Sequence, residues 1–113
     1  MSAIICLDPG HGGKQPGASN GIRLERDDVL KLALAVRDKL TAAGVIVMMT
    51  RDSDVDVGID DRCKTANNSG AAYFLSIHRN AATASATGHE IWISSKATAE
   101  ERGSARTILD AIV

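Results

Sequence analysis

Three short, continuous apolar runs limit the fold of this chain more than any other feature of its sequence. The runs are Ala3–Leu7, Val45–Thr50 and Ala72–Ile77. Each has the length of a buried strand, and the first is rich in β-branched residues and is stopped by a Pro-Gly pair. Two segments with helical character separate them, Asp27–Ala43 and Ile59–Ser69. Continuous apolar strands that alternate with helices are typical of a parallel sheet. We therefore predict an α/β fold: a single domain with a mostly parallel sheet and helices on both faces.

The remaining segments extend this alternation. Glu90–Ser94 is predicted as a fourth strand, and Thr98–Val113 as a last helix. Residues 8–22 are rich in glycine and are predicted to be a loop. In parallel sheets of this kind, ligands bind beyond the carboxyl ends of the strands. Residues that directly follow the strands are therefore the first candidates for a functional site.

Composition excludes several classes of protein. The 113 residues carry a formal net charge of -1, so no nucleic-acid partner is predicted. We find no run of about 18 apolar residues and no signal peptide, so no membrane partner is predicted. Cys6 lies in an apolar run and is predicted to be buried, while Cys63 lies in a polar helix; a disulfide between them stays open.

Two histidines follow predicted strands and are expected at the same edge of the sheet. His11 comes after the first strand and His78 after the third, and Glu25 stands at the entry to the first helix. Two imidazoles and a carboxylate form a common catalytic zinc set that leaves a fourth position for water. The other interpretation is that two unrelated loop histidines accompany an ordinary carboxylate at the start of a helix. The residues alone leave both interpretations open.

An ordered series of motifs resembles the zinc-dependent N-acetylmuramoyl-L-alanine amidases of the bacterial autolysin and phage endolysin type. In chain order the motifs are LDPGHGG, PGA, NGIRLERD, MTRDSD, DDR, AN and LSIHRNA. The resemblance covers essentially the whole chain, and it implies that His11, Glu25 and His78 are the ligands of a Zn²⁺ cofactor. It also implies that the substrate is peptidoglycan, that the amide between N-acetylmuramic acid and L-alanine is hydrolysed, and that the enzyme acts at the bacterial cell wall.

One part of the family pattern is not found. Family members continue into a strand that ends in a glutamate with an acid–base role, and this residue would lie beyond Val113. We therefore expect residues 1–113 to be an amidase catalytic domain that is incomplete at its C-terminal side, with its catalytic base unknown. The alternative is a zinc-binding wall module with weak or no activity. Association through the incomplete side is a further expectation, and the choice between phage lysin and host autolysin stays open.

Other polar residues have a structural and a functional interpretation. Asn80 follows the His78 turn and is predicted either to bind substrate or to hold the loop. His89 precedes the fourth strand and is expected at the surface, unless that strand is antiparallel and brings it near the site. The acidic residues 52–56 lack the pattern of a calcium loop, and Arg51 and Arg62 are expected to hold this segment by ion pairs.

Overall fold

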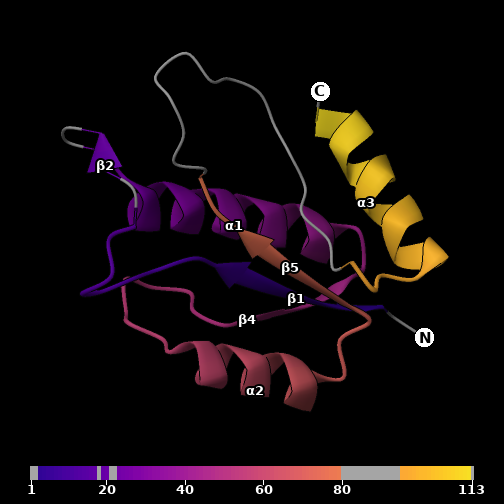
Figure 1. Ribbon diagram of the computed structural model, residues 1–113, viewed down its shortest axis with the longest axis horizontal. Coiled ribbons are helices and arrows are strands. Elements are labelled where there is room, and N and C mark those ends of the chain that lie inside the picture. The colour runs from indigo at the N-terminus through magenta and orange to yellow at the C-terminus, as the bar shows by residue number, and fades with distance from the viewer. Residues whose placement is uncertain (1–2, 18, 21–22, 80–94, 113) are drawn as a thin grey trace. The chain divides into compact units, whose positions relative to one another are not determined.

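The structure, a computed structural model, describes residues 3–17, 19–20, 23–79 and 95–112 (Figure 1). The chain forms two compact units, Met1–Ala81 and Ala82–Val113. The second unit contains helix α3 (Ala99–Ile112), which confirms the predicted last helix. Its first turn is capped by Thr98, whose hydroxyl accepts a hydrogen bond from the Glu101 N–H at 3.1 Å. The predicted strand Glu90–Ser94 lies outside the described residues.

The first unit is built on a parallel sheet of three strands in the order β4-β1-β5. The strands are β1 (Ile4–Pro9), β4 (Ile46–Met49) and β5 (Tyr73–Ile77). Strand β1 is central, and its four residues Cys6–Pro9 are buried. The predicted parallel sheet is confirmed, and its order places the residues that follow β1 and β5 beside each other.

Helices cover the two faces of this sheet, with α1 (Glu25–Ala42) on one side and α2 (Ile59–Ser69) on the other (Figure 1). Val29 and Ala33 on α1 are buried together with Cys6 and Leu7 of β1, so the core is small and aliphatic. Helix α2 ends as predicted at Gly70, which takes a left-handed conformation with φ of 72°. This arrangement confirms helices on both faces.

Two boundaries differ from the sequence-based prediction by two residues, and the other shifted boundaries differ by one. Strand β1 continues through Asp8 to Pro9, because both residues pair with β5. Proline has no N–H to donate to a neighbouring strand. Strand β4 ends opposite Leu7, so no β4 residue lies opposite Pro9 and no hydrogen bond to β4 is lost there. Helix α1 begins at Glu25 instead of Asp27, since Leu24 is extended and the Arg26 N–H already donates to the Pro16 carbonyl at 3.0 Å.

A short antiparallel pair begins within residues 8–22, which were predicted to be a loop, and ends just after them. Its strands are β2 (Ser19–Asn20) and β3 (Arg23–Leu24). The pair leads directly into α1, so it sets where the first residue of that helix begins. Two-residue strands are too short to leave a periodic signal in the sequence, which is why they were not predicted.

Two further observations concern the state of the cysteines and the length of the helices. Cys6 and Cys63 are both free, the first buried in β1 and the second exposed on α2. Burial raises the pKa of the Cys6 thiol, and the charge of Asp8 adds to this effect. None of the helices in the described part of the chain is long and apolar enough to cross a bilayer.

Candidate metal centre

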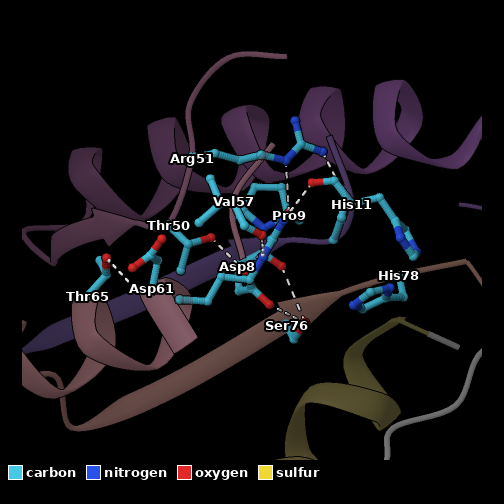
Figure 2. Close-up of polar contacts among 12 residues, drawn as sticks. Asp8, Pro9, His11, Thr50, Arg51, Val57, Asp61, Thr65, Ser76 and His78 are labelled. Carbon is cyan, nitrogen blue, oxygen red and sulfur yellow. Dashed lines mark hydrogen bonds and ion pairs between the residues drawn. The ribbon is translucent and has the colours of Figure 1, made fainter. Parts of the chain in front are cut away.

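Three side chains from separate parts of the sequence meet at the carboxyl edge of the sheet. His11 follows β1, Glu25 is the first residue of α1, and His78 directly follows β5. One ligand atom from each lies within 4.8 Å of the others. Glu25 Oε2 is 3.2 Å from His11 Nε2 and 3.0 Å from His78 Nδ1. The structure therefore brings together all three predicted ligands, and Figure 2 shows the two imidazoles beside each other.

The two carboxylate–imidazole distances suit a tetrahedral metal ion. Ligand atoms that lie 2.0–2.1 Å from such an ion are about 3.3 Å from one another, close to both carboxylate–imidazole distances. The carboxylate is buried with 3% exposure, whereas the imidazoles of His11 and His78 are 31% and 48% exposed. A metal held here would have its protein ligands on one side and an accessible side for a further ligand.

The Glu25 carboxylate is also fixed from the His78 side. Its Oε2 accepts a hydrogen bond from the Arg79 N–H at 3.0 Å. The Arg79 guanidinium pairs with Asp28, one turn further along α1, at 3.2 Å. The end of β5 and the start of α1 are therefore joined through both main chain and side chain, which holds Glu25 and His78 in register.

Two glycines leave the space that the imidazoles occupy. A Cβ on Gly10 would collide with the His78 ring, with its Nδ1 at 2.5 Å and its Nε2 at 2.7 Å. A Cβ on Gly17 would lie 2.6 Å from Glu25 Oε1 and 2.8 Å from His11 Nε2. Gly17 also has a positive φ of 71°, which disfavours other residues. The glycine-rich stretch therefore leaves the volume in which the side chains of the candidate ligands pack.

Behind the ligands lies a buried polar cluster centred on Asp8. Its carboxylate accepts hydrogen bonds from Thr50 Oγ1 at 2.6 Å, Ser76 Oγ at 2.6 Å and Arg62 Nη1 at 2.7 Å. Burial would raise the pKa of Asp8, but these three hydrogen bonds and the charge of Arg62 outweigh burial and lower the pKa below its usual value. Asp8 is therefore a charged structural group beneath the site.

Sequence reasoning missed this cluster and gave its arginines other partners. The ion pair of Arg62 is with Asp8 and not with the acidic loop, and Arg51 donates to main-chain carbonyls. The loop is held by the hydrogen bond from Arg51 to the Ser53 carbonyl at 2.9 Å, which is not an ion pair, and by Asp54, which accepts from the Gly13 N–H at 2.7 Å. The sequence signal for the cluster is a charged residue directly after an apolar run, because a carboxylate that the strand carries into the core requires buried partners. Asn80 lies outside the described residues, so its predicted role stays a prediction.

The fold and the site together define a class: an α/β protein with two imidazoles and one carboxylate gathered at the carboxyl edge of its parallel strands. This ligand composition is that of catalytic rather than structural zinc centres. The family model described as N-acetylmuramoyl-L-alanine amidase matches residues 5–113. The chain belongs to this family of amidases.

Individual relatives agree with that assignment. A sporulation-specific N-acetylmuramoyl-L-alanine amidase of Bacillus subtilis is 45% identical over 91 residues, covering 79% of this chain and 35% of the relative. An endolysin of Bacillus phage SPP1 is 48% identical over 83 residues, covering 72% of this chain and 30% of the relative. The crystal structure of an N-acetylmuramoyl-L-alanine amidase from Clostridium difficile 630 matches with a TM-score of 0.92 and 35% identity. That match covers 99% of this chain and 63% of the solved one. The chain thus spans about a third of the length of these two curated relatives.

Proposed function

We propose that the chain carries the metal site of a zinc-dependent amidase that hydrolyses the bond between N-acetylmuramic acid and L-alanine in peptidoglycan. The observation that carries this proposal is the convergence of His11, Glu25 and His78 at one sheet edge. Family membership supports the substrate and the bond, since the similar proteins include several named for this amide. The proposed place of action is the bacterial cell wall.

The residues present fit the proposed cofactor, and His11, Glu25 and His78 would hold it. When bound, zinc supplies a Lewis acid that polarises a carbonyl group and makes water more acidic. The chain's own contribution is to fix the ligand atoms and to leave one side open. Glu25 is buried and oriented by the Arg79 N–H, and the two imidazoles are partly exposed, so a bulky glycan-peptide can approach them from solvent.

Residues 1–113 are proposed to be an amidase catalytic domain, and Asn80 is proposed to bind the substrate. Asn80 follows Arg79, whose main chain already contacts Glu25. A substrate hydrogen bond from Asn80 predicts that Asn80→Ala raises KM for peptidoglycan while zinc content stays unchanged. Loss of zinc in this variant would instead assign Asn80 to holding the loop.

Zinc content of the purified chain tests the metal site. We expect about one zinc per chain after dialysis against buffered zinc, and loss of that zinc in His11→Ala and His78→Ala. The third histidine supplies a matched control, because His89→Ala is expected to retain the metal. If His11→Ala and His78→Ala keep their zinc, the site is wrongly assigned.

Hydrolysis of purified cell wall tests the activity separately. The proposal predicts zinc-dependent release of free L-alanine amino termini, together with lactyl carboxyl groups on the glycan strands. Glu25→Gln is expected to abolish this release, whereas the exposed Asp52→Asn is the charge-matched control. Stoichiometric zinc without new amino termini would support the alternative, a zinc-binding wall module with weak or no activity.

A further inference from the structure

Two buried arginines converge on the turn that carries His11. We propose that Arg51 and Arg62 are positioning residues that hold the His11 imidazole toward Glu25 and His78. The inference rests on the proposed metal site, because it gives these arginines the task of shaping one of its ligands. Arg51 lies two residues after β4 and Arg62 in the first turn of α2, so two different elements reach the same turn.

Three consecutive carbonyl groups of the turn accept hydrogen bonds from the two guanidinium groups. The Pro9 carbonyl accepts from Arg51 Nε at 3.0 Å and from Arg62 Nη1 at 2.7 Å. Arg51 Nη2 donates to the Gly10 carbonyl at 2.8 Å, and Arg62 Nη2 donates to the His11 carbonyl at 2.7 Å. Figure 2 shows Arg51 directed at Pro9. Hydrogen bonds from outside the turn therefore fix the orientation of the carbonyl groups of Pro9, Gly10 and His11.

Both guanidinium groups are themselves anchored. Arg62 is held by Asp8 Oδ1 at 2.7 Å and by the Val57 carbonyl, to which its Nε donates at 2.8 Å. Arg51 donates to the Ser53 carbonyl at 2.9 Å and to the Arg26 carbonyl at 2.8 Å. Arg26 directly follows Glu25, so one guanidinium group joins the segments that carry two of the candidate ligands.

His11 needs such support because its backbone is in an unfavourable conformation. It has a φ of 59° and is the non-glycine residue with positive φ in the described part of the chain. This left-handed region brings Cβ close to the following carbonyl in an L-residue, so it persists only where the surroundings enforce it. Gly12 and Gly13 follow with φ of 128° and 53°, and they add no side chains that would enforce it.

Charge alone does not explain this choice of residues. Arg51 and Arg62 are 3% and 8% exposed, and two buried cations beside a metal site repel each other and the ion. Burial lowers the pKa of Arg51, and the charge of Arg62 lowers it further. What arginine supplies is a planar fork that reaches several carbonyls at once, which lysine cannot do. Lysine variants therefore separate geometry from charge.

The geometry is tested in the metal-free, isotope-labelled full chain by NMR. The His11 and His78 ring centroids lie 4.9 Å apart in an edge-to-face arrangement, so a nuclear Overhauser effect between their ring protons is expected. In Arg51→Lys and Arg62→Lys this signal should weaken at least about threefold, because the positions of the two rings are no longer held together. Ala33→Gly, which destabilises α1 away from the site, is the control and should retain the signal. Retention of the signal in both folded lysine variants overturns the proposal.

Cobalt affinity measures the consequence for metal binding. Co²⁺ titrations followed by visible absorption should give about 10- to 100-fold weaker binding in the lysine variants, as for other residues that orient metal ligands. Equal affinity in wild type and both variants also overturns the proposal. If the wild type binds neither cobalt nor zinc, the proposed metal function fails, and the ring–ring signal alone decides the role of the arginines. If the lysine variants do not fold, Asp8→Asn, which loosens Arg62 while keeping both guanidinium groups, must show the same losses, and an unchanged signal there counts against the proposal.

Discussion

Replacing Asp8 with alanine removes an acceptor that three buried groups share. Asp8 is 5% exposed and binds Arg62, Thr50 and Ser76 through its two carboxylate oxygens. In Asp8→Ala the Arg62 charge loses its carboxylate partner, while two hydroxyl groups lose theirs. We expect the free energy of unfolding to fall by about 3–5 kcal/mol, the usual effect of breaking a buried ion pair from one side.

The size of this effect follows from what remains in the variant. Hydrogen bonds to a charged group contribute about 1.5–3 kcal/mol each. The sum over the three bonds is only an upper limit for the loss, because contributions within one network are not additive. Arg62 keeps the carbonyl groups of Pro9, Val57 and His11, which reduces the loss. Asp8→Asn preserves volume and one carbonyl acceptor, so we expect it to cost about half as much as Asp8→Ala.

Urea denaturation followed by circular dichroism, in the presence of a chelator, measures the loss. For an unfolding slope of about 2 kcal/mol/M, the midpoint of Asp8→Ala should lie about 2 M below that of the wild type. Asp38→Ala is the control, because Asp38 is 71% exposed and pairs only with its neighbour Arg37 among the contacts described. If Asp8→Ala shifts the midpoint by less than about 0.5 M, the cluster does not stabilise the fold as argued.

Three further outcomes follow from the site. Gly10→Ala should push the His78 ring aside and weaken zinc binding at least about tenfold, as measured by chelator competition, because the new methyl group overlaps that ring. Gly17→Ala should weaken zinc binding and also lower the urea midpoint, since its φ of 71° disfavours alanine and the methyl group meets His11; wild-type affinity would contradict the packing. The lowered pKa of Asp8 stabilises the fold above about pH 3.9, the unfolded value, and this contribution is lost as the pH falls through the lower folded value. The difference in urea midpoint between wild type and Asp8→Asn should therefore shrink between about pH 6 and pH 2.5, and a constant difference would refute the assignment.

Local sequence patterns predicted most of the secondary structure. Helix α2 was predicted with the observed bounds, since Ile59–Ser69 ends at a glycine that stops the helix. The end of β1 was not predicted, because Pro9-Gly10 is a strong local stop signal. What extends the strand is pairing with β5, whose residues come more than sixty positions later, as the separation of 68 between Asp8 and Ser76 shows. Patterns read in short windows carry no information about such partners.

The candidate site was predictable to the extent that topology determined it. His11 and His78 follow parallel strands, and neighbouring strands bring their carboxyl ends together, so the meeting of the imidazoles needed only the strand order. The roles of Arg51 and Arg62 were not predictable in this way. Their partners are mostly main-chain carbonyls, which every residue possesses, so the sequence does not distinguish those that are used.

The position of β1 in the middle of the sheet also determines the order in which this unit can fold. Strand β1 is synthesised before both of its partners, β4 and β5, whose hydrogen bonds to it close loops of about forty and about seventy residues. While the ribosome is still producing the chain, β1 is an apolar strand with both edges unpaired and a charged Asp8 without Arg62 and Ser76. An N-terminal fragment that ends before β5 lacks His78 and therefore cannot assemble the three candidate ligands, so folding of this unit waits for β5.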